Sequence, residues 1–148
     1  MQASSGITDI AHGIQLAVAP VFLLSAVGAV LAVLTNRLGR IIDRARVLEE
    51  ASPDASAVKQ HGMRAELQHL AKRAGLIHAA ITLSTACALI ICLVIVTLFA
   101  EVALGRQLSG LIVVLFITGM CAFVGAFIFF LLEIGSATAS LRFGSVRR

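Results

Sequence analysis

The sequence predicts an all-α membrane protein with three transmembrane helices, the first two of which extend into a cytoplasmic antiparallel helical hairpin. Of its 148 residues, 59% are hydrophobic and only 14% are charged, whereas about a quarter of the residues in a soluble domain are charged. Three stretches contain no Asp, Glu, Lys or Arg: 14–36, 74–100 and 107–132. Each exceeds the roughly 20 residues that a helix needs to cross about 30 Å of hydrocarbon.

The first apolar stretch does not have the features of a secretory signal peptide. Such a peptide places positive charge before a short apolar region, but the first 13 residues contain no Lys or Arg. We therefore expect an uncleaved first span. The predicted order is an N-terminal tail at 1–13, helices at 14–36, 74–100 and 110–133, a hairpin at 37–73, a loop at 101–109 and a tail at 134–148.

The positive charges predict the orientation, because Lys and Arg near span ends favour the cytoplasmic side. Eight of the 12 Lys and Arg residues lie between the first two spans, three follow the third span, and only Arg106 lies between spans two and three. The N-terminal tail and the 101–109 loop should be periplasmic, and the C-terminus cytoplasmic. This bias accounts for the pI near 9.6, so no nucleic-acid partner is expected.

The first helix is predicted to continue beyond the membrane. Apolar residues spaced by four, three, four and three draw one stripe along a helix, and this spacing occurs at Leu34, Leu38, Ile41, Ala45 and Leu48.

A chain reversal should follow this first stripe, because Pro53 disfavours helix at Ser52. The same spacing then returns at Met63, Leu67, Leu70, Ala74 and Ile77. Two such stripes joined by a short turn predict an antiparallel helical hairpin.

Two segments carry a family resemblance. The segment IQLAVAPVFLLSAVGAVLAVLTNRLGRIIDRARVLEE resembles the N-terminal signature of a bacterial membrane family catalogued as domain of unknown function 2721, and FLLEIGSATASLR resembles its C-terminal end. The resemblance implies a small three-span protein of the bacterial inner membrane, and it brings no established activity or ligand. Its most specific positions are Pro20, Asn36, Arg37, Leu38, Arg40, Asp43, Arg44, Arg46 and Glu133.

Glu133 ends the third span, where a carboxylate is costly unless it reaches water, pairs with a cation or is protonated. We expect a paired structural clasp, with a snorkelling carboxylate and a proton or ion relay as alternatives. Depth counting places Lys72 and Arg73 at the same boundary, and a nearby His78 would make a pH sensor possible. The predicted charge cluster comprises Arg37, Arg40, Asp43, Arg44, His78 and Glu133. Its arginines should also attract anionic lipid headgroups.

A second stripe on the first helix carries small and polar residues: Ser25, Ala29, Ala32 and Asn36. Small residues allow helices to approach closely, and Ser and Asn hydrogen-bond across such contacts. We expect a helix-packing face, with a pore lining between subunits as the alternative.

Neither an enzyme nor a cofactor is predicted. The chain has no G-x-S-x-G, no H-E-x-x-H and no phosphate-binding glycine loop, so no catalytic, cofactor or metal residue is expected. The sequence favours a non-enzymatic structural or regulatory membrane protein that associates with itself. The alternative is a homo-oligomeric channel or transporter subunit with the first helix lining the pathway. No protein partner can be named.

Overall fold

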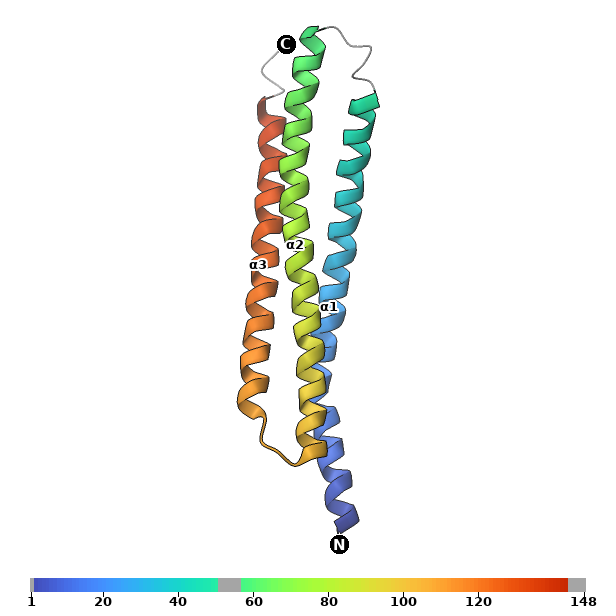
Figure 1. Ribbon diagram of the computed structural model, residues 1–148, viewed down its shortest axis with the longest axis vertical. Coiled ribbons are helices and arrows are strands. Elements are labelled where there is room, and N and C mark those ends of the chain that lie inside the picture. The colour runs from blue at the N-terminus through green and yellow to red at the C-terminus, as the bar shows by residue number, and fades with distance from the viewer. Residues whose placement is uncertain (1, 51–56, 144–148) are drawn as a thin grey trace. The chain divides into compact units, whose positions relative to one another are not determined.

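The computed structural model describes residues 2–50 and 57–143, and it describes the side-chain surroundings of 13–50 and 59–136. It contains three helices, α1 Gln2–Glu50, α2 Ala57–Leu104 and α3 Ser109–Phe143 (Figure 1). Each is long and apolar enough to cross a membrane. The prediction of an all-α membrane protein with three such helices is confirmed.

Helix α1 passes through its charged half without a break, as its apolar spacing predicts. Pro20 lies inside the helix, where it removes one backbone hydrogen bond without ending the helix. The helix also begins at Gln2, within the segment expected to be a tail. The predicted turn at Pro53 lies outside the described residues.

Helices α2 and α3 are joined by residues 105–108. Gly105 directly follows α2 and has a φ of 60°, the left-handed conformation that commonly ends a helix and that glycine adopts without strain. The amide of Ile112 donates to the carbonyl oxygen of Leu108 at 3.1 Å. Helix α3 then extends to Phe143, well into the segment that was expected to be a tail.

The chain divides into two compact units. The first unit contains residues 1–31 and 83–124, and the second contains 32–82 and 125–148. The core of the first unit is centred on Val27 of α1 and on Cys87 and Ile91 of α2, all fully buried. A Cβ atom added to Gly119 would lie 3.3 Å from side-chain atoms of Ile90 and Ile91, so α3 approaches α2 closely at this glycine.

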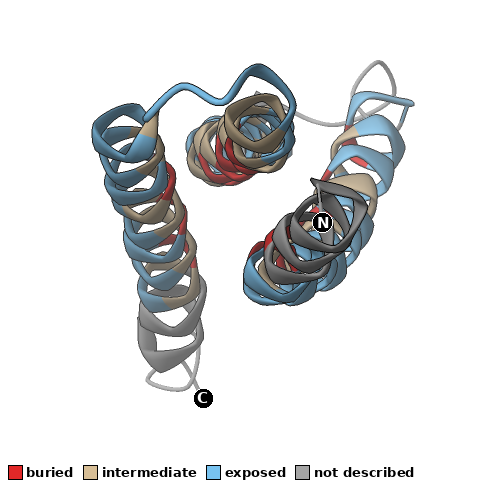
Figure 2. Ribbon diagram, turned by 90° about the horizontal axis from the view of Figure 1, so that it is seen from below, coloured by how far each residue is buried: buried red, intermediate tan, exposed pale blue. Residues whose placement is uncertain are grey.

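The second unit is built on the two predicted apolar stripes. Every member of both stripes is buried or half-buried, as contact faces of α1 and α2 require. Figure 2 shows the buried positions of the helices in red. Arg44 meets Glu66, whereas Arg37 and Arg73 meet at Glu133. Residue numbers therefore fall along α2 as they rise along α1, so the two helices run antiparallel in this unit. The cytoplasmic location of this pair stays a prediction.

Much of the exposed surface of the helices is apolar. Large hydrophobic side chains are more than half exposed on all three helices, among them Phe22, Val96 and Leu131. A water-soluble protein rarely leaves so many large apolar side chains open to solvent. Hydrocarbon is the solvent that suits this surface, in agreement with the membrane class.

Candidate functional site

Glu133 is a fully buried charged residue of the second unit. It lies on α3 seven residues after the buried Ala126, on the same side of the helix. Its side chain has no exposed surface. The Ser136 hydroxyl donates to the backbone carbonyl oxygen of Glu133 at 2.7 Å, one turn further along. A carboxylate without water depends on partners to replace its hydration.

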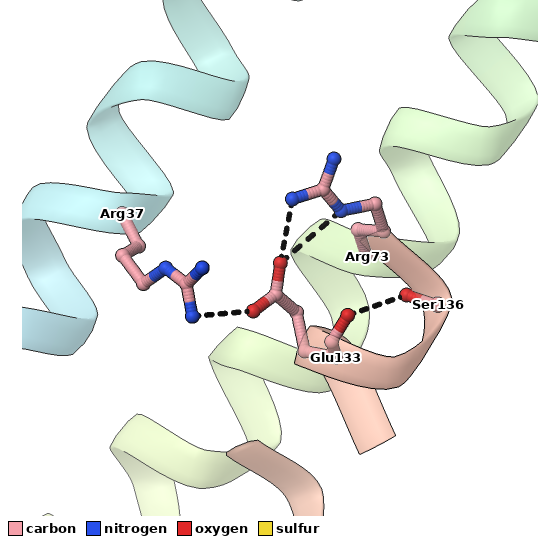
Figure 3. A network of polar contacts seen from close by, with 4 residues as sticks. All are labelled: Arg37, Arg73, Glu133 and Ser136. Atoms are coloured by element: carbon pink, nitrogen blue, oxygen red, sulfur yellow. Dashed lines mark hydrogen bonds and ion pairs between the residues drawn. The ribbon is translucent and has the colours of Figure 1, made fainter. Parts of the chain in front are cut away.

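Two arginines from two other helices provide those partners (Figure 3). Arg73 of α2 donates to Oε1 from Nε at 3.1 Å and from Nη2 at 2.7 Å. Arg37 of α1 places Nη1 3.0 Å from Oε2. This second contact is an ion pair without hydrogen-bond geometry, since Oε2 has no hydrogen-bond donor in the described part of the chain. Glu133 thus links three helices, through two hydrogen bonds from Arg73 and an ion pair with Arg37.

Arg37 has a further contact on α3. Its guanidinium carbon lies 5.3 Å from the centre of the Phe130 ring, within the range of a cation–π interaction. Phe130 precedes Glu133 by three residues, so the two side chains lie about one turn apart on the same face of α3 and both contact Arg37. One side chain of α1 is therefore fixed against α3 by an aromatic ring and a carboxylate.

A cleft of about 280 Å³ lies beside the carboxylate. Two apolar residues, Ile41 and Leu70, form part of its wall. The other lining residues are Arg37, Arg40, Arg44, Arg73 and Glu133.

The four arginines of the cleft differ in their pairing. Arg44 donates to Oε1 of Glu66 from Nε at 3.0 Å and Nη2 at 2.9 Å, in an exposed pair. Arg37 and Arg73 share Glu133. Arg40 takes part in none of the ion pairs formed between residues 13–50 and 59–136. The cleft therefore holds more positive than negative charge.

The structure brings together four of the six residues predicted as a charge cluster. Arg37 contacts Glu133, and Arg40 and Arg44 line the cleft with them. Asp43 is exposed and forms no ion pair with any described residue. It is turned by about 100° around α1 from Arg44, which takes it off the face that lines the cleft.

His78 also stays outside the cluster. The preceding residue, Ile77, is fully buried, and the turn of the helix leaves His78 exposed. His78 does not line the cleft, and its backbone carbonyl oxygen accepts a hydrogen bond from the Thr82 hydroxyl at 2.9 Å. The geometry provides no contact through which this histidine could sense Glu133.

Arg73 is the main residue that the predicted cluster lacked, although it was expected at the same boundary. Ala80, seven residues further along α2, is fully buried. Position 73 therefore continues a second buried side of α2, next to the stripe that contains Leu70 and Ile77. The sequence signal for Arg73 is its position seven residues before Ala80, which places both residues on the same side of α2.

The four small and polar residues of α1 do not pack within this chain. Ser25, Ala29, Ala32 and Asn36 are all exposed, and the Ser25 hydroxyl donates to the carbonyl oxygen of Val21 at 3.3 Å. Larger residues provide the packed side of α1, with Val27 and Leu34 fully buried. The prediction that these four residues face a neighbouring helix is wrong for helices of the same chain. Contact with a second copy stays a prediction.

Within the described residues, no group of three or more His, Cys, Asp or Glu side chains is placed to hold a metal ion. Comparison with curated proteins and comparison with solved structures each gave no match. The family described as "Protein of unknown function (DUF2721)" matches residues 17–143, which include α1 from Ala17 onward, all of α2 and α3, and the Glu133 site. The chain therefore belongs to the DUF2721 family of proteins of unknown function.

Proposed function

We propose that this chain is a non-enzymatic structural protein of the bacterial inner membrane, in which Glu133 acts as a clasp between helices. The single observation that supports the clasp is one fully buried carboxylate shared by arginines of two other helices. Removing such a carboxylate leaves uncompensated charge, which is strongly destabilising. The same groups fix the register of the helices, because two hydrogen bonds from the rigid Arg73 guanidinium to one oxygen allow only a narrow range of geometries.

The partners of Glu133 argue for a clasp and against a proton relay. A relay requires neighbouring groups that accept and release protons in turn. The charged groups that contact Glu133 within the described residues are Arg37 and Arg73, and an arginine side chain does not release its proton in proteins. His78, the nearest candidate on sequence grounds, is exposed and outside the cleft.

The proposed orientation places the second unit at the cytoplasmic face, with the N-terminus outside and the C-terminus inside. It is supported by the eleven Lys and Arg residues that flank the proposed inner side, all except Arg106. Single cysteines introduced near Ser4 or near Gly105, in a variant that lacks the three native cysteines, should react with an impermeant thiol reagent added from outside. Labelling only after the membrane is opened would reverse the orientation.

Ion flux tests the structural function against the channel alternative. Purified protein in liposomes should leave a preset potassium gradient intact, as protein-free liposomes do, and an ionophore added at the end should release it. A flux that rises with the protein-to-lipid ratio would replace the structural function by the channel, with the exposed face of α1 as the conduit lining.

A further inference from the structure

We propose that the arginine cleft beside Glu133 is a binding site for a phosphate group, carried by an anionic lipid headgroup or by free phosphate. The inference rests on the proposed function in one respect, since the Glu133 clasp holds two of the four arginines in place. It goes beyond that function by assigning a ligand class to the cleft.

Charge is the first argument. Four arginines line the cleft, while Glu133 is the acidic residue in its lining and Glu66 pairs with Arg44 from outside it. Four positive charges less two negative charges leave an excess of two. A phosphodiester carries one negative charge, and a phosphate monoester or free phosphate carries between one and two near neutral pH. A phosphate group therefore matches the excess without reversing it.

Hydrogen-bond donors are the second argument. A guanidinium has five N–H donors in a fixed plane and suits phosphate oxygens. Arg73 uses Nε and Nη2 for Glu133, and Arg37 directs Nη1 at the same carboxylate. Arg40 uses none of its donors in an ion pair with a described residue. Each of these three side chains therefore has further N–H groups for a ligand in the cleft.

The dimensions and walls of the cleft are the third argument. The cleft of about 280 Å³ is many times larger than the roughly 10–15 Å³ that a cavity needs to hold a single water, so a phosphate group fits in it. The apolar wall formed by Ile41 and Leu70 excludes water on one side. Charge attraction is stronger in such surroundings than in bulk water.

The position of the cleft along the sequence explains why a lipid is one of the two sources. Arg37 directly follows an apolar stretch that ends at Asn36, and Glu133 directly follows one that ends at Leu132. The ends of membrane helices lie at the level of the lipid headgroups, where basic side chains meet anionic lipids. Free phosphate would reach the same arginines from the water.

The test compares Arg40→Gln with Arg46→Gln. Both arginines are exposed residues of α1, and both substitutions remove one positive charge. Arg40 lines the cleft and Arg46 does not. Neither belongs to the Glu133 clasp, so the melting temperature without ligand should stay close to that of the wild type.

Two ligands are offered to each variant, and the melting temperature is followed. One is inorganic phosphate, added to protein in neutral detergent with chloride at equal ionic strength as the control. The other is phosphatidylglycerol in phosphatidylcholine nanodiscs, with pure phosphatidylcholine as the control. The wild type and Arg46→Gln should be stabilised by at least one ligand. Arg40→Gln should need about tenfold more of it, because a charge-assisted hydrogen bond contributes about that factor.

A response to inorganic phosphate identifies free phosphate as a ligand, and a response to phosphatidylglycerol alone identifies the lipid headgroup. The proposal is overturned if neither ligand stabilises the wild type. It is equally overturned if Arg40→Gln and Arg46→Gln weaken the response alike, because diffuse surface charge then accounts for it. Such a failure leaves the clasp untouched, since the clasp is judged by the ligand-free stability of Glu133 variants.

Discussion

Arg73 donates two hydrogen bonds to a single oxygen of Glu133, from Nε at 3.1 Å and from Nη2 at 2.7 Å, across 60 residues of sequence (Figure 3). Both side chains are largely or fully withdrawn from solvent, with 22% of Arg73 and none of Glu133 exposed. Arg44 makes the same kind of contact with Glu66, but both of those side chains are exposed. The same kind of arginine–glutamate pair thus occurs once buried and once exposed in this protein. Comparing the two pairs shows how much burial, as opposed to hydrogen-bond geometry, contributes to stability.

Replacing Glu133 should destabilise the protein far more than replacing Glu66. Glu133→Ala leaves two arginines facing a void, and the loss of one partner from a buried pair costs about 3 kcal/mol or more. Glu133→Gln keeps a hydrogen-bond acceptor and should cost less. Glu66→Gln should cost under about 1 kcal/mol, as exposed pairs do. Thermal unfolding of the purified variants in one detergent measures all three.

Equal melting temperatures for Glu66→Gln and both Glu133 variants would show that Glu133 needs no cationic partner. It would then be a snorkelling residue that rehydrates freely. A low expression level alone does not decide the matter, so the comparison is made on purified protein.

The fold was predictable because its determinants are local and periodic. Uncharged length predicts the membrane helices, and alternating spacings of three and four locate contact faces such as Leu34 to Leu48. Ser25 and Ala29 are exposed within the chain, because small residues allow close packing but do not require it. Their neighbour Val27 offers more surface to bury, and it is the residue at the core of the first unit.

The charge cluster was predictable only in part, because its partners come from different helices. The position of Glu133 at a span end indicated the need for a cation, and Arg37 was a correct choice. Predicting which of Lys72, Arg73 and His78 pairs with Glu133 requires knowing how α2 is rotated about its own axis. That rotation depends on how α2 packs against the other helices. A span-end position alone does not define that rotation.

Ser84→Ala should leave stability unchanged or raise it by about 1 kcal/mol. Ser84 is fully buried, and its hydroxyl has no hydrogen-bond partner among the described residues. Removing an unsatisfied buried hydroxyl removes its desolvation cost. Ser25→Ala is the matched control, because the Ser25 hydroxyl already donates to a backbone carbonyl oxygen. A loss of more than about 1 kcal/mol in Ser84→Ala alone would mean that this hydroxyl has a partner.

Gly119 and Gly75 should respond differently to alanine. A Cβ atom on Gly75 meets nothing within 4 Å, so Gly75→Ala should stabilise α2 by about 0.5–1 kcal/mol through helix propensity. A Cβ atom on Gly119 would lie 3.3 Å from Ile90 and Ile91. Gly119→Ala should therefore gain less or lose stability, and Gly119→Leu should lose about 1–3 kcal/mol by overpacking. Equal gains from both alanines, measured by thermal unfolding, would contradict the close approach of α3 to α2.

The double variant Ala29→Leu/Ala32→Leu tests whether the exposed side of α1 contacts a second copy. Both alanines are exposed in the chain, so its own fold should tolerate the change. If copies pack through this face, overpacking costs about 1–3 kcal/mol and crosslinking in native membranes should give a smaller oligomer. If the face lines a pore, the oligomer should persist while ion flux falls. No change in either assay would mean that lipid covers this face.

The most direct test of the Glu133 clasp is a double-mutant cycle for Arg73→Gln and Glu133→Gln, run beside the same cycle for Arg44→Gln and Glu66→Gln. Each cycle isolates the coupling between two side chains, because effects of either substitution alone cancel. The clasp predicts a coupling of about 2 kcal/mol for Arg73 with Glu133, within the range for residues in direct contact. It predicts less than about 1 kcal/mol for the exposed pair. Couplings that are equal, or a coupling near zero for Arg73 with Glu133, would contradict the claim that this carboxylate holds the helices together.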